Sequence, residues 1–125
     1  MTTIQSHRDL IVWQKAMDLA EIVYALAARF PSKETYRLGS QITRAAASVP
    51  ANIAEGNARG TKRDYANFLS VAKGSLMEAE TFLTLAVRLK FITQGEASTA
   101  FASVTEVSKM LTSLRTKLKE GADQV

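Results

Sequence analysis

The residues of this sequence that could take part in chemistry form a polar stripe in its second quarter. They are spaced by three or four positions throughout: Arg37, Gln41, Arg44, Ser48, Asn52, Glu55 and Arg59. At 3.6 residues per turn, this spacing keeps all of them within an arc of about 80° on one helix. Guanidinium groups beside amide, hydroxyl and carboxylate side chains favour binding, either to phosphate groups or to the polar surface of another subunit. The sequence leaves both alternatives open.

A cluster of positive charge follows the polar stripe in the segment RGTKRD, from Arg59 to Asp64. We place this segment at a corner between two helices, where the free backbone N–H groups at the start of the third helix also attract anions. Arginine and lysine make most protein contacts to nucleic-acid phosphates. The formal net charge of +4 modestly favours a polyanionic partner. The candidate nucleic-acid-binding residues are Arg37, Arg44, Arg59, Lys62 and Arg63.

Patterns typical of enzymes are absent from the sequence. It has one histidine and no cysteine, which excludes disulfides and thiolate metal sites. The Glu-x-x-His pairs of di-metal helical bundles and the glycine patterns of nucleotide-binding loops do not occur. Asn52 and Glu55 could act in catalysis, but an Asn followed by a Glu three residues later is also ordinary helix chemistry. We therefore expect a non-catalytic protein with no catalytic residue, metal ion or cofactor.

The elements that position these residues are predicted to be helices. Proline and glycine divide the 125 residues into four segments, which are rich in helix formers and carry apolar residues at spacings of three and four. Capping-box patterns begin at Ser6, Thr61 and Thr93, and Ser32 could open the remaining helix. The predicted helices span residues 8–30, 33–59, 62–91 and 94–119. Short connections make successive helices antiparallel, so we predict an all-α, up-down-up-down four-helix bundle forming a single domain over residues 1–125.

Two of the predicted helices are apolar on more than one side. The predicted core stripe of the first helix is Leu10, Trp13, Met17, Ala20, Tyr24 and Ala27. A second apolar set on that helix and a flank of the third helix give the predicted oligomer interface, Val12, Leu19, Ile22, Val23, Leu26, Phe82 and Leu85. We predict self-association through these helices as a dimer or a closed ring. The alternative is a generous core with scattered exposed aliphatic residues.

A second group of residues is predicted to have a structural or interface role. This polar cluster consists of Ser48, Pro50, Asn52, Glu55 and Glu78. Because the polar stripe continues past Pro50, we expect one helix kinked near Pro50, with a break at Val49 as the alternative. Glu78 interrupts the apolar flank of the third helix, where a carboxylate needs a partner such as Arg44 or Arg59. A position at the rim of the flank, in contact with water, is the alternative for Glu78.

Several segments are similar to those of a known family. They are DLIVWQKAMDLA (9–20), SVPANIAEG (48–56), the loop 57–61, YANFL (65–69) and GSLMEAE (74–80). Through them the chain resembles, over nearly its whole length, the four helix bundle protein family, also called the 23S rRNA intervening-sequence protein family. The resemblance implies a left-handed up-down bundle and a homopentamer around a central channel. Similarity to accessory proteins of diversity-generating retroelements further implies nucleic acid and a reverse transcriptase as possible partners.

Two functions are therefore compatible with the sequence. The first is a non-catalytic homo-oligomer that binds nucleic acid, with RNA favoured, through basic surface residues. The second is a structural or adaptor protein that binds another protein and has no nucleic-acid ligand. No apolar run approaches the roughly 18 residues that a membrane span needs, so we expect no membrane partner. A cytoplasmic location is the simplest fit to a chain without cysteine.

Overall fold

The computed structural model describes residues 6–123, and residues 1–5 and 124–125 of the expected single domain lie outside this range. The described part consists of four α-helices: α1 (Ile11–Ala27), α2 (Leu38–Asn57), α3 (Lys62–Arg88) and α4 (Gln94–Asp123). Two short 3-10 helices, η1 (His7–Asp9) and η2 (Ser32–Glu34), precede α1 and α2. No helix within this range is both long and apolar enough to cross a membrane.

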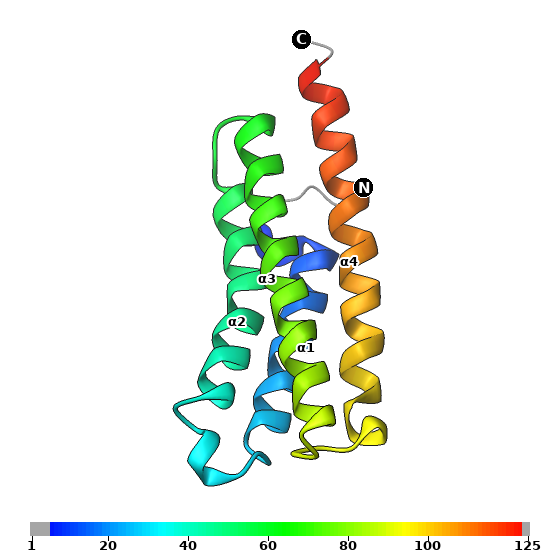
Figure 1. Cartoon of the computed structure of the whole chain (residues 1–125). Helices are drawn as coiled ribbons and strands as arrows, with labels where there is room; N and C mark the ends of the chain where they lie inside the picture. The colour runs from blue at the N-terminus through cyan, green and yellow to red at the C-terminus, as the bar shows by residue number, and fades with distance from the viewer. Residues whose placement is uncertain (1–5, 124–125) are drawn as a thin grey trace.

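The four helices lie side by side around one core (Figure 1). Each helix packs against its neighbour in the chain, and α4 also packs against α1, whereas the backbones of α1 and α3 do not approach each other closely within residues 6–123. The prediction of an all-α fold is confirmed, and these contacts are consistent with an up-down bundle. The largest fully buried side chains come from all four helices and include Leu19, Ile42, Ile53, Leu69, Leu76, Leu83 and Leu111.

Two of the predicted capping motifs begin α-helices. The Thr61 hydroxyl accepts a hydrogen bond from the backbone N–H of Asp64 at 3.1 Å and opens α3. Thr93 and Glu96 form a reciprocal box before α4, in which each side chain accepts from the backbone N–H of the other residue, at 3.0 and 2.8 Å. The box at Ser6 instead opens η1, and α1 begins only at Ile11. The sequence motif was therefore correctly identified, but it caps a shorter element.

The second helix begins later than the predicted residue 33. Ser32 lies in η2, and Arg37 interrupts the helical conformation with φ −117° and ψ −111° before α2 starts at Leu38. Glu34 is buried at this point, and one of its carboxylate oxygens accepts a hydrogen bond from the Leu38 N–H at 3.4 Å. The other oxygen lies 3.6 Å from the Arg37 guanidinium. A buried carboxylate thus accepts from a free N–H group in the first turn of α2, at a later position than the expected Ser32 cap.

The break at Val49 that the sequence allowed is wrong. Helix α2 runs without interruption from Leu38 to Asn57 and contains Pro50, which is buried. Proline has no N–H to donate, so the carbonyl of Ala46 loses its usual partner within the helix. Packing of Ala46, Val49 and Ile53 into the core, each fully buried, offsets this loss. The kink near Pro50 stays a prediction.

The core stripe predicted for the first helix is partly right, because Ala20 is buried and Leu10, Trp13 and Ala27 pack against the core. Met17 and Tyr24 of that stripe are 37 % and 54 % exposed, and most of the core positions of α1 come from the other apolar set. Four residues predicted at the oligomer interface, Val12, Leu19, Val23 and Leu26, are buried inside the chain. The reason is packing: this set places four branched aliphatic side chains on one side, whereas the predicted stripe carries small alanines and a tyrosine hydroxyl that prefers water. These four residues cannot face another subunit.

Candidate nucleic-acid interface

The corner between α2 and α3 is built on close contact between the two helices. A Cβ added to Gly56 would lie 2.7 Å from the Phe68 Cβ and 3.1 Å from Tyr65 Cδ1, so the last turn of α2 lies directly on the first turns of α3. Burial raises the pKa of the Tyr65 hydroxyl, an effect that the Asn57 side chain partly offsets. Glycine is therefore needed here for space. This packing fixes where the basic segment that follows Gly56 leaves the bundle.

Arg59 is held in place just after the end of α2. Its guanidinium lies over the Phe68 ring, 4.7 Å from the ring centroid, and forms an ion pair with Glu55 at 3.1 Å. Both charged side chains remain about half exposed, at 47 % and 56 %. Stacking on an aromatic face and an ion pair four residues apart each contribute about 0.5 kcal/mol at such exposed positions. Arg59 is thus oriented while still accessible to an anion.

Lys62 and Arg63 occupy the first two positions of α3 and are exposed. Lys62 reaches the last turns of α4, because a Cβ added to Gly121 would lie 2.8 Å from its Nζ. In Figure 1 the α2–α3 connection and the C-terminal end of α4 accordingly lie at the same end of the bundle. A positive charge near the C-terminus of a helix is favourable. The corner and the end of α4 therefore form one basic surface.

Further cations along α3 and α4 join this surface, and the sequence reasoning missed them. Arg115 of α4 donates a hydrogen bond from Nη1 to the Ser70 hydroxyl at 2.8 Å. Lys73 of α3 donates from Nζ to the Thr112 hydroxyl at 2.6 Å. Lys119 is exposed one turn after Arg115, on the same side of α4. We call the whole group the basic corner: Arg59, Lys62, Arg63, Lys73, Arg115 and Lys119.

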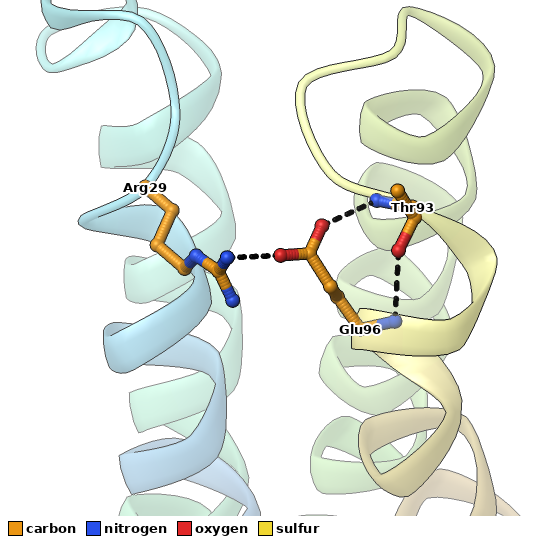
Figure 2. A network of polar contacts seen from close by, with 3 residues as sticks. All are labelled: Arg29, Thr93 and Glu96. Carbon is orange, nitrogen blue, oxygen red and sulfur yellow. Dashed lines mark hydrogen bonds and ion pairs between the residues drawn. The ribbon is translucent and has the colours of Figure 1, made fainter.

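The opposite end of the bundle balances its charges differently. Figure 2 shows Arg29, just after α1, paired with Glu96, which also takes part in the capping box with Thr93. The backbone hydrogen bond from Thr93, together with its hydroxyl and the Arg29 charge, lowers the pKa of Glu96. Arg37 is paired with Glu34 at the same end. In contrast, the four ion pairs formed by described side chains include Arg59 but no other member of the basic corner.

The predicted nucleic-acid-binding residues do not all come together. Arg59, Lys62 and Arg63 share the basic corner, whereas Arg37 precedes α2 and lies about 30 Å away at 1.5 Å per helical residue. Arg44 is exposed midway along α2. The spacing in the sequence shows which residues share a face of α2, but residues on one face can still lie far apart along the helix axis. Arg115 and Lys119 could have been found from the predicted antiparallel order of the helices, because this order brings the end of the fourth helix to the start of the third.

The predicted polar cluster is divided between two environments. Ser48 and Ser75 are joined by a hydrogen bond between α2 and α3, and the Asn52 amide donates to the Ser48 carbonyl at 2.8 Å. Glu78 is exposed and forms no ion pair with Arg44 or Arg59 in the described chain, so the expected pairing within the bundle is wrong. Its position on the outer side of α3 leaves the carboxylate in water, which removes the need for a partner.

Among residues 6–123, no three His, Asp or Glu side chains cluster closely enough to hold a metal ion. The arrangement at the basic corner is suited instead to binding anions by charge and hydrogen bonds. Four cationic side chains lie along the contact between α3 and α4: Lys62 and Lys119, which are exposed, and Lys73 and Arg115, which are partly buried and hydrogen-bonded between the helices. Such a row of cations matches a phosphate backbone better than a single phosphate.

Comparisons with known proteins agree with the fold. The family model described as 23S rRNA-intervening sequence protein matches residues 8–113. A crystal structure of a protein with unknown function from the S23 ribosomal protein family of Bacteroides thetaiotaomicron is 26 % identical, with a TM-score of 0.76. The similarity covers 84 % of this chain and 98 % of that one. No curated protein matches the sequence.

Proposed function

Because the chain belongs to the 23S rRNA-intervening sequence protein family, we propose that it is a non-catalytic protein that binds nucleic acid, RNA above all, through the basic corner. The observation that carries this proposal is the contact of Lys62 with α4 at Gly121, which joins cations from distant parts of the chain into one surface. The related crystal structure is described as belonging to a ribosomal protein family, and this also favours RNA. Phosphate contacts of this kind bind without reading sequence.

Self-association is the second part of the proposal. Three apolar side chains on the outer side of α3 remain exposed, Val71 at 53 %, Leu85 at 42 % and Leu89 at 50 %. On α1, which lies diagonally across the bundle from α3, Met17 and Tyr24 are exposed. Two different apolar surfaces suit a head-to-tail contact, in which the α3 surface of one copy packs on the α1 surface of the next. Such contacts close into a ring when the rotation between successive copies divides a full turn evenly. Five copies is the number that the family resemblance implies, and a ring would repeat the basic corner and raise avidity.

Sedimentation of two variants tests self-association. Leu85→Glu combined with Leu89→Glu places two charges on the apolar flank of α3, and we expect it to shift the protein toward the monomer. Thr84→Glu is the matched control, because Thr84 is exposed beside this flank and its replacement adds charge without removing apolar surface. A wild-type protein that sediments as a monomer at every concentration would contradict this part of the proposal.

Fluorescence anisotropy tests nucleic-acid binding. The probe is a fluorescein-labelled RNA hairpin, with a DNA duplex of the same sequence as comparison. We expect Lys62→Glu/Arg63→Glu to weaken RNA binding at least tenfold, because two attractive charges become repulsive. Lys33→Glu/Arg88→Glu changes the net charge equally at the other end of the bundle, where both residues are exposed, and we expect less than threefold weakening. Absence of binding to RNA and DNA would instead favour the adaptor function.

A further inference from the structure

Helix α1 is shorter than α3 and α4, and among residues 6–123 only Ser6, the short helix η1 and Leu10 precede it. It has 17 residues, against 27 in α3 and 30 in α4. The ion pair between Lys15 and Glu106, at 3.2 Å, fixes the register of α1 against α4. Because the two helices run in opposite directions, α4 residues well beyond Glu106 have no α1 residue opposite them. About 20 Å of α4 therefore extends past the start of α1.

A groove lies where α1 begins against α4, with a volume of about 570 Å³. Its surface is mainly apolar and includes Leu10 and Ile11 on one side and Met110 and Leu114 on the other. Ile11 is 62 % exposed, more than any other exposed Val, Leu or Ile side chain in the described range. We call this feature the α1–α4 groove. Its volume is in the range of ligand-binding clefts, but it is open along its length.

Two lysines of α4 line the same groove. Lys109 and Lys117 are both exposed, and eight residues of helix separate them, which corresponds to about 12 Å. Asp9, on the α1 side, also lines the groove, and its carboxylate accepts a hydrogen bond from the Ser6 N–H at 3.3 Å as part of a capping box. The groove therefore combines an apolar floor with a cationic rim that extends over two helical turns.

We propose that the α1–α4 groove binds an amphipathic, acidic helix of another protein. Two turns of such a helix would place apolar side chains, three and four residues apart, on Met110, Leu114 and Ile11. Acidic residues about two turns apart would meet Lys109 and Lys117. The bound helix would lie against the last turns of α4, beside the start of α1.

This surface is separate from the one proposed for nucleic acid. Arg115 points from α4 toward Ser70 of α3, whereas Lys109 and Lys117 border the side that faces α1. A second copy of this chain does not suit the groove as a symmetric partner, because a two-fold contact would bring four lysines together. Peptide binding and RNA binding are thus expected to respond to different substitutions.

Fluorescence anisotropy with a synthetic peptide tests the proposal. The probe is a fluorescein-labelled, alanine-rich peptide of about 16 residues with leucines along one face and two glutamates two turns apart beside them. We expect saturable binding to the full chain. The same peptide with both glutamates replaced by lysine is the control, and we expect it to bind at least tenfold more weakly.

Charge exchange makes the test specific. Lys109→Glu/Lys117→Glu should lose at least tenfold affinity for the glutamate peptide and gain affinity for the lysine peptide. Ile11→Ser, which removes an exposed apolar contact, should weaken binding about fivefold. Lys33→Glu/Arg88→Glu should bind as the wild type does. The proposal would be overturned if the wild type shows no saturable binding, if it binds both peptides equally, or if charge exchange does not restore binding. It would also be overturned if the wild type binds no peptide and Lys109→Glu/Lys117→Glu loses self-association instead.

Discussion

Replacing Gly56 with alanine tests whether the α2–α3 corner is as tightly packed as its geometry indicates. The new Cβ would lie 2.7 Å from the Phe68 Cβ, about 0.7 Å closer than the 3.4 Å at which ordinary contact begins. Neither atom can rotate away, because both are fixed to the backbones of buried helix faces. Overpacking of this kind costs about 1–3 kcal/mol, and alanine regains up to about 1 kcal/mol from its helix propensity. We therefore expect a net loss of about 0–2 kcal/mol.

Gly74→Ala is the matched control, because Gly74 lies inside α3 and nothing lies within 4 Å of an added Cβ. This variant should gain about 1 kcal/mol. Urea unfolding followed by circular dichroism measures both changes in the free energy of unfolding. In thermal unfolding, a shift in Tm of about 3–5 °C per kcal/mol is expected for a chain of this size. Equal stabilisation by the two substitutions would refute the close packing of α2 on α3, and with it the fixed position of the basic corner.

Two further predictions concern the helix ends. Lys90 has a positive φ of 64° after α3, in a turn closed by a hydrogen bond from the Phe91 N–H to the Ala86 carbonyl at 2.9 Å. Lys90→Gly should therefore stabilise the protein by about 1 kcal/mol in thermal unfolding, whereas Lys90→Ala should not. The pKa of Glu96 is lowered from its ordinary value of 4.5, so its contribution to stability is complete above that value and is lost as the pH falls through the lowered pKa. The Tm difference between wild type and Glu96→Gln should thus shrink on acidification below about pH 4.5, and a constant difference down to about pH 2 would contradict the assignment.

The sequence was most informative where local chemistry determines local structure. The caps at Thr61 and Thr93 could be predicted, because a hydroxyl three residues before a carboxylate satisfies the free N–H groups of a first turn. The continuity of α2 through Pro50 was predicted from the polar stripe alone. The buried carboxylate of Glu34 at the start of α2 was missed, since nothing in its neighbours distinguishes it from a solvated residue.

Packing between helices could not be predicted in the same way. Helix α1 is apolar on two sides, so periodicity alone does not say whether Leu19 or Tyr24 faces the core. The same limit applied to the candidate site. Arg59, Lys62 and Arg63 are adjacent in sequence and were found, whereas Lys73 and Arg115 join them only through the contact between α3 and α4. Arg37 was grouped with them because it shares their helix face, although helix length separates it from the corner.

The measurement that tests the central claim most directly is the salt dependence of RNA binding. For a protein that binds through phosphate contacts, log K falls linearly with log salt, with a slope of about −0.7 to −0.9 per contact. With the RNA hairpin, the account predicts a wild-type slope of about −3 to −5 and a slope shallower by about 2 in Lys62→Glu/Arg63→Glu. Binding that does not change with salt, or a slope that this double substitution leaves unchanged, would contradict the assignment of the basic corner as the nucleic-acid interface.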